Sequence, residues 1–312
     1  MDVSTQYVPE IKRLLKEKNA VLLAHYYQES EIQDLADFVG DSLALAKAAE
    51  RTNADIIVFA GVHFMAETVK IINPDKKVIV PDLDASCSLS ETCTPENFKN
   101  FIELHPGHTV VTYINTSIGV KVLSDIVCTS SNAEKVIQSI PIDKPILFGP
   151  DKNLGKYLME KTGRKMVLWD GSCIVHEAFA LDKILKICKD HPEAKIIAHP
   201  ESDASILQIS SFVGSTSALI NFANKDSSET YIVATEAGIL HKMKALLPNK
   251  NLIPAPIRED NECACGECSY MKLNTLEKLY QCIKNEAPII ELSDQIRLKA
   301  LKPIERMLEI SP

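Results

Sequence analysis

The chain has 312 residues, 46% hydrophobic and 24% charged, which suits one large α/β domain or two to three smaller ones. Its net charge of -8 argues against a nucleic-acid partner, because phosphate backbones attract basic surfaces. No apolar run approaches the roughly 20 residues that span a bilayer, and residues 1–21 lack the apolar core of a signal peptide. We therefore expect a cytoplasmic protein whose nine cysteines are metal ligands and buried thiols rather than a disulfide framework.

Short apolar runs alternate with amphipathic segments along the chain, which predicts strands alternating with helices. A helix is predicted first, at residues 1–18. The predicted strands are 19–28, 54–61, 76–87, 108–117, 144–150, 164–173, 194–203, 229–236 and 250–268. The helices predicted between and after them are 40–50, 62–72, 128–138, 152–162, 214–224, 238–248 and 293–310.

Polar residues recur at a nearly fixed period along these elements. His25 and Tyr113 are 88 positions apart, and Tyr113 and His199 are 86 apart. The same two offsets separate three residues at the starts of predicted helices, Ser42, Ser130 and Thr216. A fixed period with matching element order indicates internal duplication. Any α/β protein alternates strands and helices, but polar residues recurring at one register favour triplication.

Each repeat has the order βαβαβ, which predicts a small parallel sheet with helices on both faces. The expected fold class is α/β, with three repeated three-layer αβα domains around a pseudo-threefold axis and a central cavity for a metal cluster. We predict the domains at 19–106, 107–192 and 193–290, after the N-terminal helix at 1–18. The tail at 291–312 is expected to be helical and to pack on the outside.

Pairs of polar side chains mark the end of the first strand of each repeat. The members of a pair are two residues apart, so on an extended strand they point the same way. Because ligands bind outside the carboxyl ends of parallel strands, we expect the pairs to line one cavity. They are His25 and Tyr27, Tyr113 and Asn115, and His199 and Glu201.

The third strand of each repeat ends in cysteine: Cys87, Cys173 and one of three in CACGEC, residues 263–268. Three thiolates on one axis suit a [4Fe–4S] cluster with an open iron, a Lewis acid toward a substrate hydroxyl or carboxylate. Taken alone, the three cysteines of CACGEC are also typical of a zinc site, and so is the pair of Cys173 and His176. The repeat position of Cys173 favours the cluster. Four cysteines break the period and are interpreted as buried thiols: Cys93, Cys128, Cys188 and Cys282.

Motifs spread over almost the whole chain resemble the quinolinate synthase family of bacterial and archaeal NAD biosynthesis. They include AHYYQ (24–28), GDSLALA (40–46), CTSSNA (128–133), WDGSCIVHE (169–177) and VGSTS (213–217). The resemblance implies three similar domains around one [4Fe–4S] cluster per chain.

The resemblance also identifies the cluster ligands as Cys87, Cys173 and Cys268. Cys268 is preferred because the family's ligand directly precedes a segment like SYMK, although Ser269 stands where many relatives have proline. Cys263 and Cys265 are then a redox pair, spare thiols or structural residues.

The resemblance further implies a transferase that condenses iminoaspartate with dihydroxyacetone phosphate to quinolinate, phosphate and water. The expected partners are these small molecules and neither nucleic acid nor membrane, with a functional link to the L-aspartate oxidase or dehydrogenase that supplies iminoaspartate. Two other hypotheses stand beside it. One is a different hydro-lyase with an open-iron cluster, and the other is a non-catalytic iron–sulfur or zinc sensor built on the terminal cysteines.

For this reaction Glu201 is the expected general base, with Tyr27 as its partner and His199 and His25 as further catalytic residues. A lone glutamate there would more often be an exposed loop carboxylate, but its register favours a role. The residues expected to bind the anionic substrates are His25, Ser42, Tyr113, Asn115, Ser130, His176, His199, Glu201, Ser215 and Thr216. Those at helix starts also suit a simple capping role.

Overall fold

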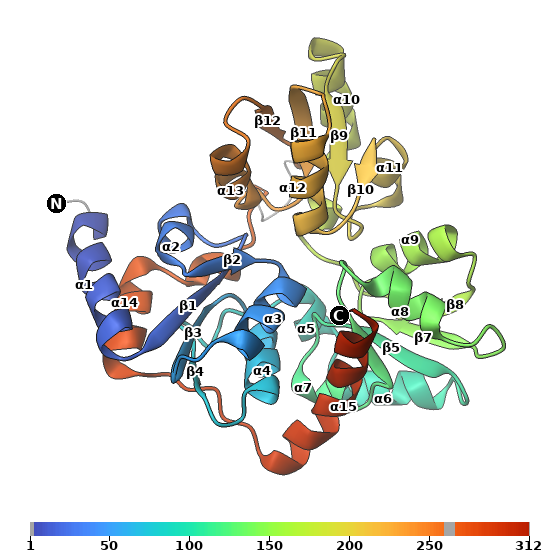
Figure 1. Ribbon diagram of the computed structural model, residues 1–312. Coiled ribbons are helices and arrows are strands. Elements are labelled where there is room, and N and C mark those ends of the chain that lie inside the picture. The colour runs from blue at the N-terminus through green and yellow to red at the C-terminus, as the bar shows by residue number, and fades with distance from the viewer. Residues whose placement is uncertain (1–2, 259–265, 312) are drawn as a thin grey trace.

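The computed structural model describes residues 3–258 and 266–311, and these form three separate four-stranded parallel sheets (Figure 1). The strand orders are β2-β1-β3-β4, β6-β5-β7-β8 and β10-β9-β11-β12. We refer to each sheet with the helices packed on it as the first, second and third unit. The three equal topologies confirm the predicted α/β fold of three repeated units.

The strands of the three sheets are short, between two and six residues each. The first sheet holds β1 (Ala20–His25), β2 (Phe38–Gly40), β3 (Ile56–Ala60) and β4 (Lys77–Ile79). The second holds β5 (Thr109–Tyr113), β6 (Ile126–Cys128), β7 (Ile146–Gly149) and β8 (Met166–Leu168). The third holds β9 (Lys195–Ala198), β10 (Phe212–Val213), β11 (Thr230–Ala234) and β12 (Asn251–Pro254).

The prediction of three strands per repeat was wrong, because each sheet gains an edge strand that the sequence pattern did not indicate. These strands are β2, β6 and β10, with two or three residues each. A run so short shows no alternation of apolar and polar side chains. In the second unit the predicted helix at 128–138 therefore begins only at Ala133, and Cys128 ends β6.

Helices cover both faces of each sheet. In chain order they are α1 (Val3–Glu17), α2 (Ser30–Leu35), α3 (Ser42–Arg51), α4 (His63–Ile72), α5 (Ser88–Thr92), α6 (Pro95–Glu103), α7 (Ile118–Lys121), α8 (Ala133–Ser139), α9 (Lys152–Thr162), α10 (Leu181–Asp190), α11 (Ala204–Gln208), α12 (Thr216–Lys225), α13 (Ile239–Leu246), α14 (Leu276–Asn285) and α15 (Asp294–Ile310). None of these helices is long and apolar enough to cross a membrane.

The three layers arise because successive strand residues point to opposite faces. In β1, Leu22 joins the apolar cluster with α1 and α14, whereas its neighbour Leu23 joins the cluster with α3 and α4. The third unit repeats this division, since Ile196 packs with α10 and Ile197 packs with α12 and α13. Burial on both faces explains why the central strands contain almost only apolar residues.

Two helices pack on the sheet that follows them in the chain. Phe98 of α6 contacts the cluster of the second sheet, and Ile184 of α10 contacts that of the third. The predicted domain boundaries at 19–106, 107–192 and 193–290 place these helices with the preceding sheet, and the boundaries stay a prediction.

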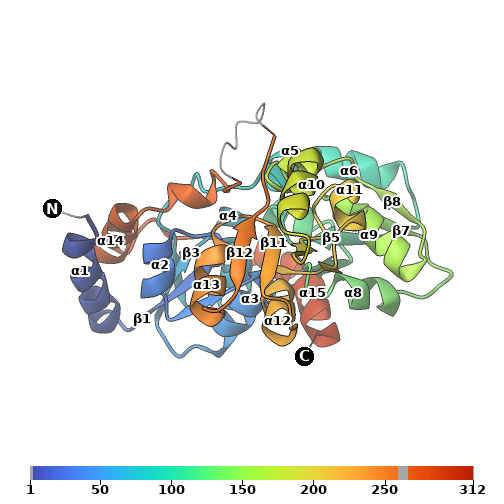
Figure 2. The same cartoon turned by 90° about the horizontal axis from the view of Figure 1, so that it is seen from above.

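The helical tail α15 returns from the third unit to the first two. Ala300, Ile304 and Met307 are fully buried in an apolar cluster that both the first and the second unit share. Figure 1 shows this red helix between the blue helices of the first unit and the green α8 of the second. Figure 2 shows from above that its C-terminal end lies beside α8. The tail thus joins two units as well as covering them.

Shortening a buried side chain of α15 should destabilise the protein. We expect Ile304→Ala to lower the free energy of unfolding by about 2–5 kcal/mol, because it leaves a cavity between two units. Ile296→Ala is the matched control on the same helix, with a side chain 44% exposed and an expected change within about 0.5 kcal/mol. Denaturant unfolding followed by circular dichroism measures both, and equal effects would contradict the role of α15 as a shared core helix.

Candidate active site

The three units meet at a cavity of about 650 Å³. It lies at the carboxyl ends of the first strands, where parallel sheets place their ligands. The predicted site residues on its wall are His25, Tyr27, Ser42, Cys87, Tyr113, Asn115, Ser130, Cys173, His176, His199, Glu201, Thr216 and Cys268. The apolar part of the wall is Val62, Phe64, Met65, Val175 and Met271. The structure therefore brings together all predicted residues except Ser215.

His25 and His199 are placed alike by the first and third units. The backbone N–H of Tyr27 donates to His25 Nδ1 at 3.2 Å, and the N–H of Glu201 donates to His199 Nδ1 at 3.4 Å. Burial lowers the pKa of His25 to about 4 and that of His199 to about 3. Both rings are therefore neutral at neutral pH, with the proton on Nε2. Each ring can donate one hydrogen bond, as binding of a carboxylate requires.

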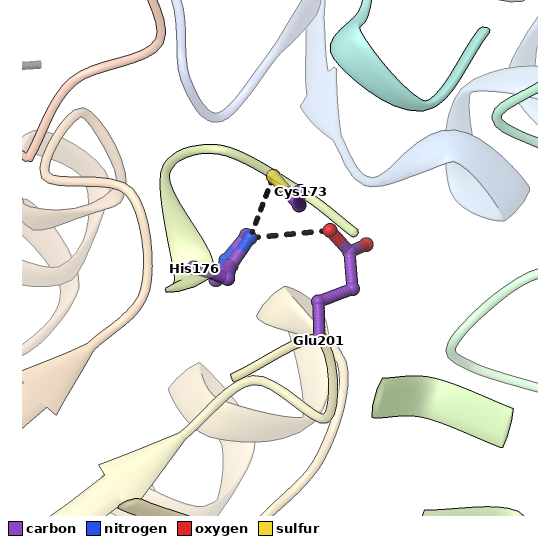
Figure 3. A group of neighbouring side chains, drawn as sticks. All are labelled: Cys173, His176 and Glu201. Carbon is purple, nitrogen blue, oxygen red and sulfur yellow. Dashed lines mark hydrogen bonds and ion pairs between the residues drawn. The ribbon is translucent and has the colours of Figure 1, made fainter. Parts of the chain in front are cut away.

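Glu201 carries a negative charge inside the protein, with only 3% of its surface exposed. Tyr113 O–H donates to Oε1 at 2.5 Å, and His176 Nδ1 lies 3.1 Å from Oε2. Figure 3 shows the His176 ring pointing at this carboxylate. Burial raises the pKa of Glu201, but His176, His199 and the hydrogen bond from Tyr113 lower it more, to below its usual value. The carboxylate is therefore ionised and able to accept a proton.

Tyr27 reaches Glu201 only through two intervening side chains. Tyr27 Oη lies 2.8 Å from Thr235 Oγ1, which lies 2.9 Å from His176 Nε2. Since a carboxylate only accepts hydrogen bonds, His176 Nδ1 donates to Glu201, Nε2 accepts from Thr235, and Thr235 accepts from Tyr27. The predicted partner of Glu201 was Tyr27, but its hydroxyl partner in the structure is Tyr113. Both tyrosines stand at strand-end positions, so the sequence could not separate them.

The helix starts differ from the prediction by one residue. Asp41 caps α3, accepting the Ala44 N–H at 3.0 Å, so Ser42 is the first helical residue instead of the cap. Ser215 caps α12, and Thr216 follows it as the first helical residue. Ser42 and Thr216 thus have hydroxyl groups on the cavity wall while their neighbours do the capping.

The loops that carry these residues are hydrogen-bonded to one another across the three units. Ser131 Oγ lies 2.9 Å from Asp41 Oδ2 and 2.9 Å from Ser215 Oγ. Ser215 therefore links units instead of lining the cavity as predicted. Ser130 is on the wall, in the turn before α8, whose N-cap is Asn132.

The three predicted ligands, Cys87, Cys173 and Cys268, are partly buried and lie on the cavity wall, one from each unit. Burial and then the neighbouring Cys268 raise the pKa of Cys87 to about 12. The pKa of Cys173 is also raised, first by burial, then by Glu201 and by both other thiols. Each of these thiolates would make ionisation of the other two less favourable. A bound cation offsets this repulsion, because a metal holds cysteine as thiolate. The donor set therefore fits an iron–sulfur cluster.

The remaining described cysteines do not line the cavity. Cys93, Cys128 and Cys282 are buried, as predicted, whereas Cys188 is only half-buried because it packs at the margin of the apolar cluster beneath α10. Cys263 and Cys265 lie outside the described residues.

Cys173, His176 and Glu201 also form a group whose ligand atoms lie within 4.8 Å of one another, close enough to hold a single metal ion (Figure 3). His176 Nδ1 is already 3.2 Å from Cys173 Sγ and within hydrogen-bonding distance of Glu201. A single ion there would leave Cys87 and Cys268 unexplained. The zinc-like pair of Cys173 and His176 is therefore better interpreted as part of the larger site.

Several buried polar residues beside the site were missed by the sequence analysis, among them Thr235, Glu236 and Asp151. Glu236 is fully buried, which raises its pKa to about 8, and burial also raises the pKa of Asp151. Glu236 and Asp151 are 85 positions apart, each two residues after the end of its strand. The repeat offset could have indicated these positions. The equivalent position is, however, Glu in the third unit, Asp in the second and Val62 in the first, so no residue type recurs.

Known proteins resemble this chain over nearly its whole length. The family model described as Quinolinate synthetase A protein matches residues 9–309. The chain is 59% identical to the quinolinate synthase of Nostoc punctiforme over 96% of this chain and 92% of the relative. It is 58% identical to that of Microcystis aeruginosa, over 96% and 94%, and 54% identical to that of a Synechococcus strain, over 99% and 97%. The chain therefore belongs to the quinolinate synthetase A family.

Proposed function

We propose that this protein is a quinolinate synthase of NAD biosynthesis, a transferase that condenses iminoaspartate with dihydroxyacetone phosphate to quinolinate, phosphate and water. The observation that supports it most is the meeting of one cysteine from each unit in the cavity that also holds Glu201 and the strand-end histidines. Near-full-length similarity to proteins named quinolinate synthase supports the same activity.

The proposed cofactor is one [4Fe–4S] cluster, held by Cys87, Cys173 and Cys268. When bound, it supplies a Lewis acid that polarises a substrate hydroxyl or carboxylate. The apolar wall residues Phe64, Met65 and Met271 would exclude water from this end of the cavity.

The substrates are small anions, and the cavity offers donors from all three units. His25 and His199 would each donate Nε2–H to a substrate carboxylate. Ser42 and Thr216, at the starts of α3 and α12, would bind the anionic groups together with backbone N–H groups of those helices. The triose hydroxyl and carbonyl oxygens would be held by Tyr113 and Asn115, and other anionic oxygens by Ser130 and His176.

Glu201 is the proposed general base because it is ionised, buried and held in one orientation by two donors. Along the same contacts a proton can move from Tyr27 to Thr235, from Thr235 to His176 Nε2 and from His176 Nδ1 to Glu201, so that Thr235 and His176 each gain one proton and lose one. This chain would let Tyr27 take up a proton from the substrate, with Glu201 as the final acceptor. Glu201 and Tyr27 would then act as a pair, as expected, but without direct contact.

The proposal includes a functional link to the L-aspartate oxidase or dehydrogenase that produces iminoaspartate. It also includes a cytoplasmic location, where thiols stay reduced. The first test is formation of quinolinate from iminoaspartate and dihydroxyacetone phosphate by anaerobically purified protein, with iron and sulfide analysis. About four irons per chain are expected, and quinolinate formation separates this activity from that of another open-iron hydro-lyase.

Single replacement of Cys87, Cys173 or Cys268 by alanine should abolish the cluster signal in electron paramagnetic resonance and the activity. The physical reason is that each unit contributes one thiolate. Cys188→Ala, a half-buried thiol away from the cavity, is the control and should keep both. A full cluster in Cys87→Ala would overturn the ligand assignment.

Loss of the cavity hydroxyl groups should weaken substrate binding while the cluster remains. For Ser42→Ala and Thr216→Ala we expect affinity to fall about tenfold to a hundredfold, since a hydrogen bond to a charged group contributes about 1.5–3 kcal/mol. Thr216→Ser keeps the hydroxyl and should retain most of the affinity. Titration of the substrates against the cluster spectrum measures this, and unchanged affinity in both alanine variants would reduce the two residues to helix-start positions without a binding role.

Glu201→Gln keeps the size of the side chain but cannot accept a proton. Turnover should fall by about 10²–10⁴-fold, the usual share of general acid–base catalysis, with the cluster intact. The measurement is single-turnover quinolinate formation, with Glu193→Gln as control because that carboxylate is exposed. If the Glu201→Gln enzyme matches the unmodified one, another residue is the base.

A further inference from the structure

One backbone hydrogen bond recurs in all three units beside the cavity cysteines. A residue just after the central strand β3, β7 or β11 donates its N–H to a carbonyl two residues before the cysteine. The three bonds are His63 to Ala85 at 2.6 Å, Lys152 to Gly171 at 2.8 Å and Ala237 to Gly266 at 3.0 Å. Each cysteine segment is thus fixed to its own sheet at the same point.

The residue preceding each donor differs between units. In the third unit it is Glu236, which is fully buried. Glu236 Oε1 accepts the backbone N–H of Cys268 at 3.0 Å, and Oε2 accepts the N–H of Gly238 at 2.7 Å. Both carboxylate oxygens therefore accept an N–H, a demand that glutamine cannot meet because it has only one acceptor oxygen.

In the second unit the equivalent residue is Asp151, also fully buried. Its Oδ1 caps α9 by accepting the Leu154 N–H at 2.7 Å. The backbone of Asp151 also forms an isolated parallel β-bridge with Gly171. Its Oδ2 is buried and has no hydrogen-bond partner among the described residues, so Asp151 does not hold the amide of Cys173. In the first unit the position is Val62, so only the shared backbone bond remains there.

We propose that Glu236 is a positioning residue that fixes the backbone of Cys268 so that its thiol faces the cavity. The proposal rests on the proposed role of Cys268 as a metal ligand.

The need for such a contact is greatest at Cys268. Gly266, two residues before it, has a backbone φ of +70°, so the segment turns sharply there. Lys272 N–H donates to the Cys268 carbonyl at 3.1 Å, and Lys272 Nζ lies 4.0 Å from Glu236 Oε1. Glu236 therefore holds both the amide of the cysteine and the lysine of the turn that follows.

A purely structural alternative is that Glu236 only stabilises the start of α13, whose N-cap is Gly238. Two variants separate the roles. Glu236→Gln keeps the length but removes one acceptor. Glu236→Asp keeps the carboxyl group and can still accept the Gly238 N–H, a bond two residues along the chain that aspartate commonly makes. Being one methylene shorter, it withdraws from Cys268.

The test uses anaerobically purified protein and two readouts besides activity. Hydrogen exchange measures the protection of the Cys268 amide, and transfer of iron to a chelator measures how firmly the site holds metal. In both Glu236 variants we expect the Cys268 amide to exchange faster and iron to leave about 10–100-fold faster, the usual effect of losing a group behind a metal ligand. Exchange around Cys87 should stay unchanged.

Two further variants are controls. Glu229→Gln makes the same chemical change at an exposed position before β11 and should behave as the unmodified protein. Asp151→Asn changes the buried carboxyl group at the equivalent position of the second unit and should leave the Cys268 amide protected.

Unchanged exchange and iron transfer in both Glu236 variants would overturn the proposal. So would equal loss of protection at all three cysteines with a lower unfolding temperature, which is the signature of a structural role alone. If the unmodified chain forms no quinolinate or binds no iron, the proposed function fails, while the exchange measurement still decides what Glu236 does.

Discussion

The buried carboxylate of Glu201 is the constraint on which the arrangement of the site depends. An ionised group inside a protein is costly unless donors surround it. Here the donors, Tyr113 and His176, come from the second unit, whereas Glu201 comes from the third. The charge is therefore stable only when the two units are correctly placed, and Thr235 and Tyr27 extend the same network to the first unit. The electrostatics of the cavity and the packing of the units therefore depend on each other.

The repeats are alike in fold and unlike in chemistry. The strand-end pairs are His–Tyr, Tyr–Asn and His–Glu, and each unit gives one thiol. A symmetric scaffold thus presents an asymmetric set of donors, acceptors and one charge around a common centre. Such an arrangement suits two different anionic substrates better than three identical walls would, because only differing walls can orient a ligand.

Much of this could be predicted from the sequence. Long apolar runs such as that of β1 and a nearly fixed period of 86 to 88 residues identified the three units and most of the cavity wall. Edge strands of two or three residues carry no periodic signal, so β2, β6 and β10 were missed. Whether Asp41 or Ser42 caps α3 depends on the exact residue at which the helix begins. Helix propensity does not resolve a boundary to one residue.

Contacts between units are the part that no local pattern contains. Tyr27 and Tyr113 occupy strand ends in different repeats, and only the placement of the sheets decides which hydroxyl meets Glu201. Glu236 shows the same limit, because a single glutamate after a strand gives no sign that its oxygens will accept the amide of a cysteine more than thirty residues away.

The return of α15 to the first two units has a consequence for the order of events during synthesis. The apolar surface that Ile304 and Met307 cover is contributed by the first and second units, which emerge from the ribosome well before residues 294–310. Until then the nascent chain exposes that surface, although Cys268 precedes α15 and is made before it. A growing chain therefore lacks its full core until its last helix is complete. Truncation near the C-terminus should accordingly harm solubility of the newly made protein, even though the removed helix contributes no residue to the cavity wall.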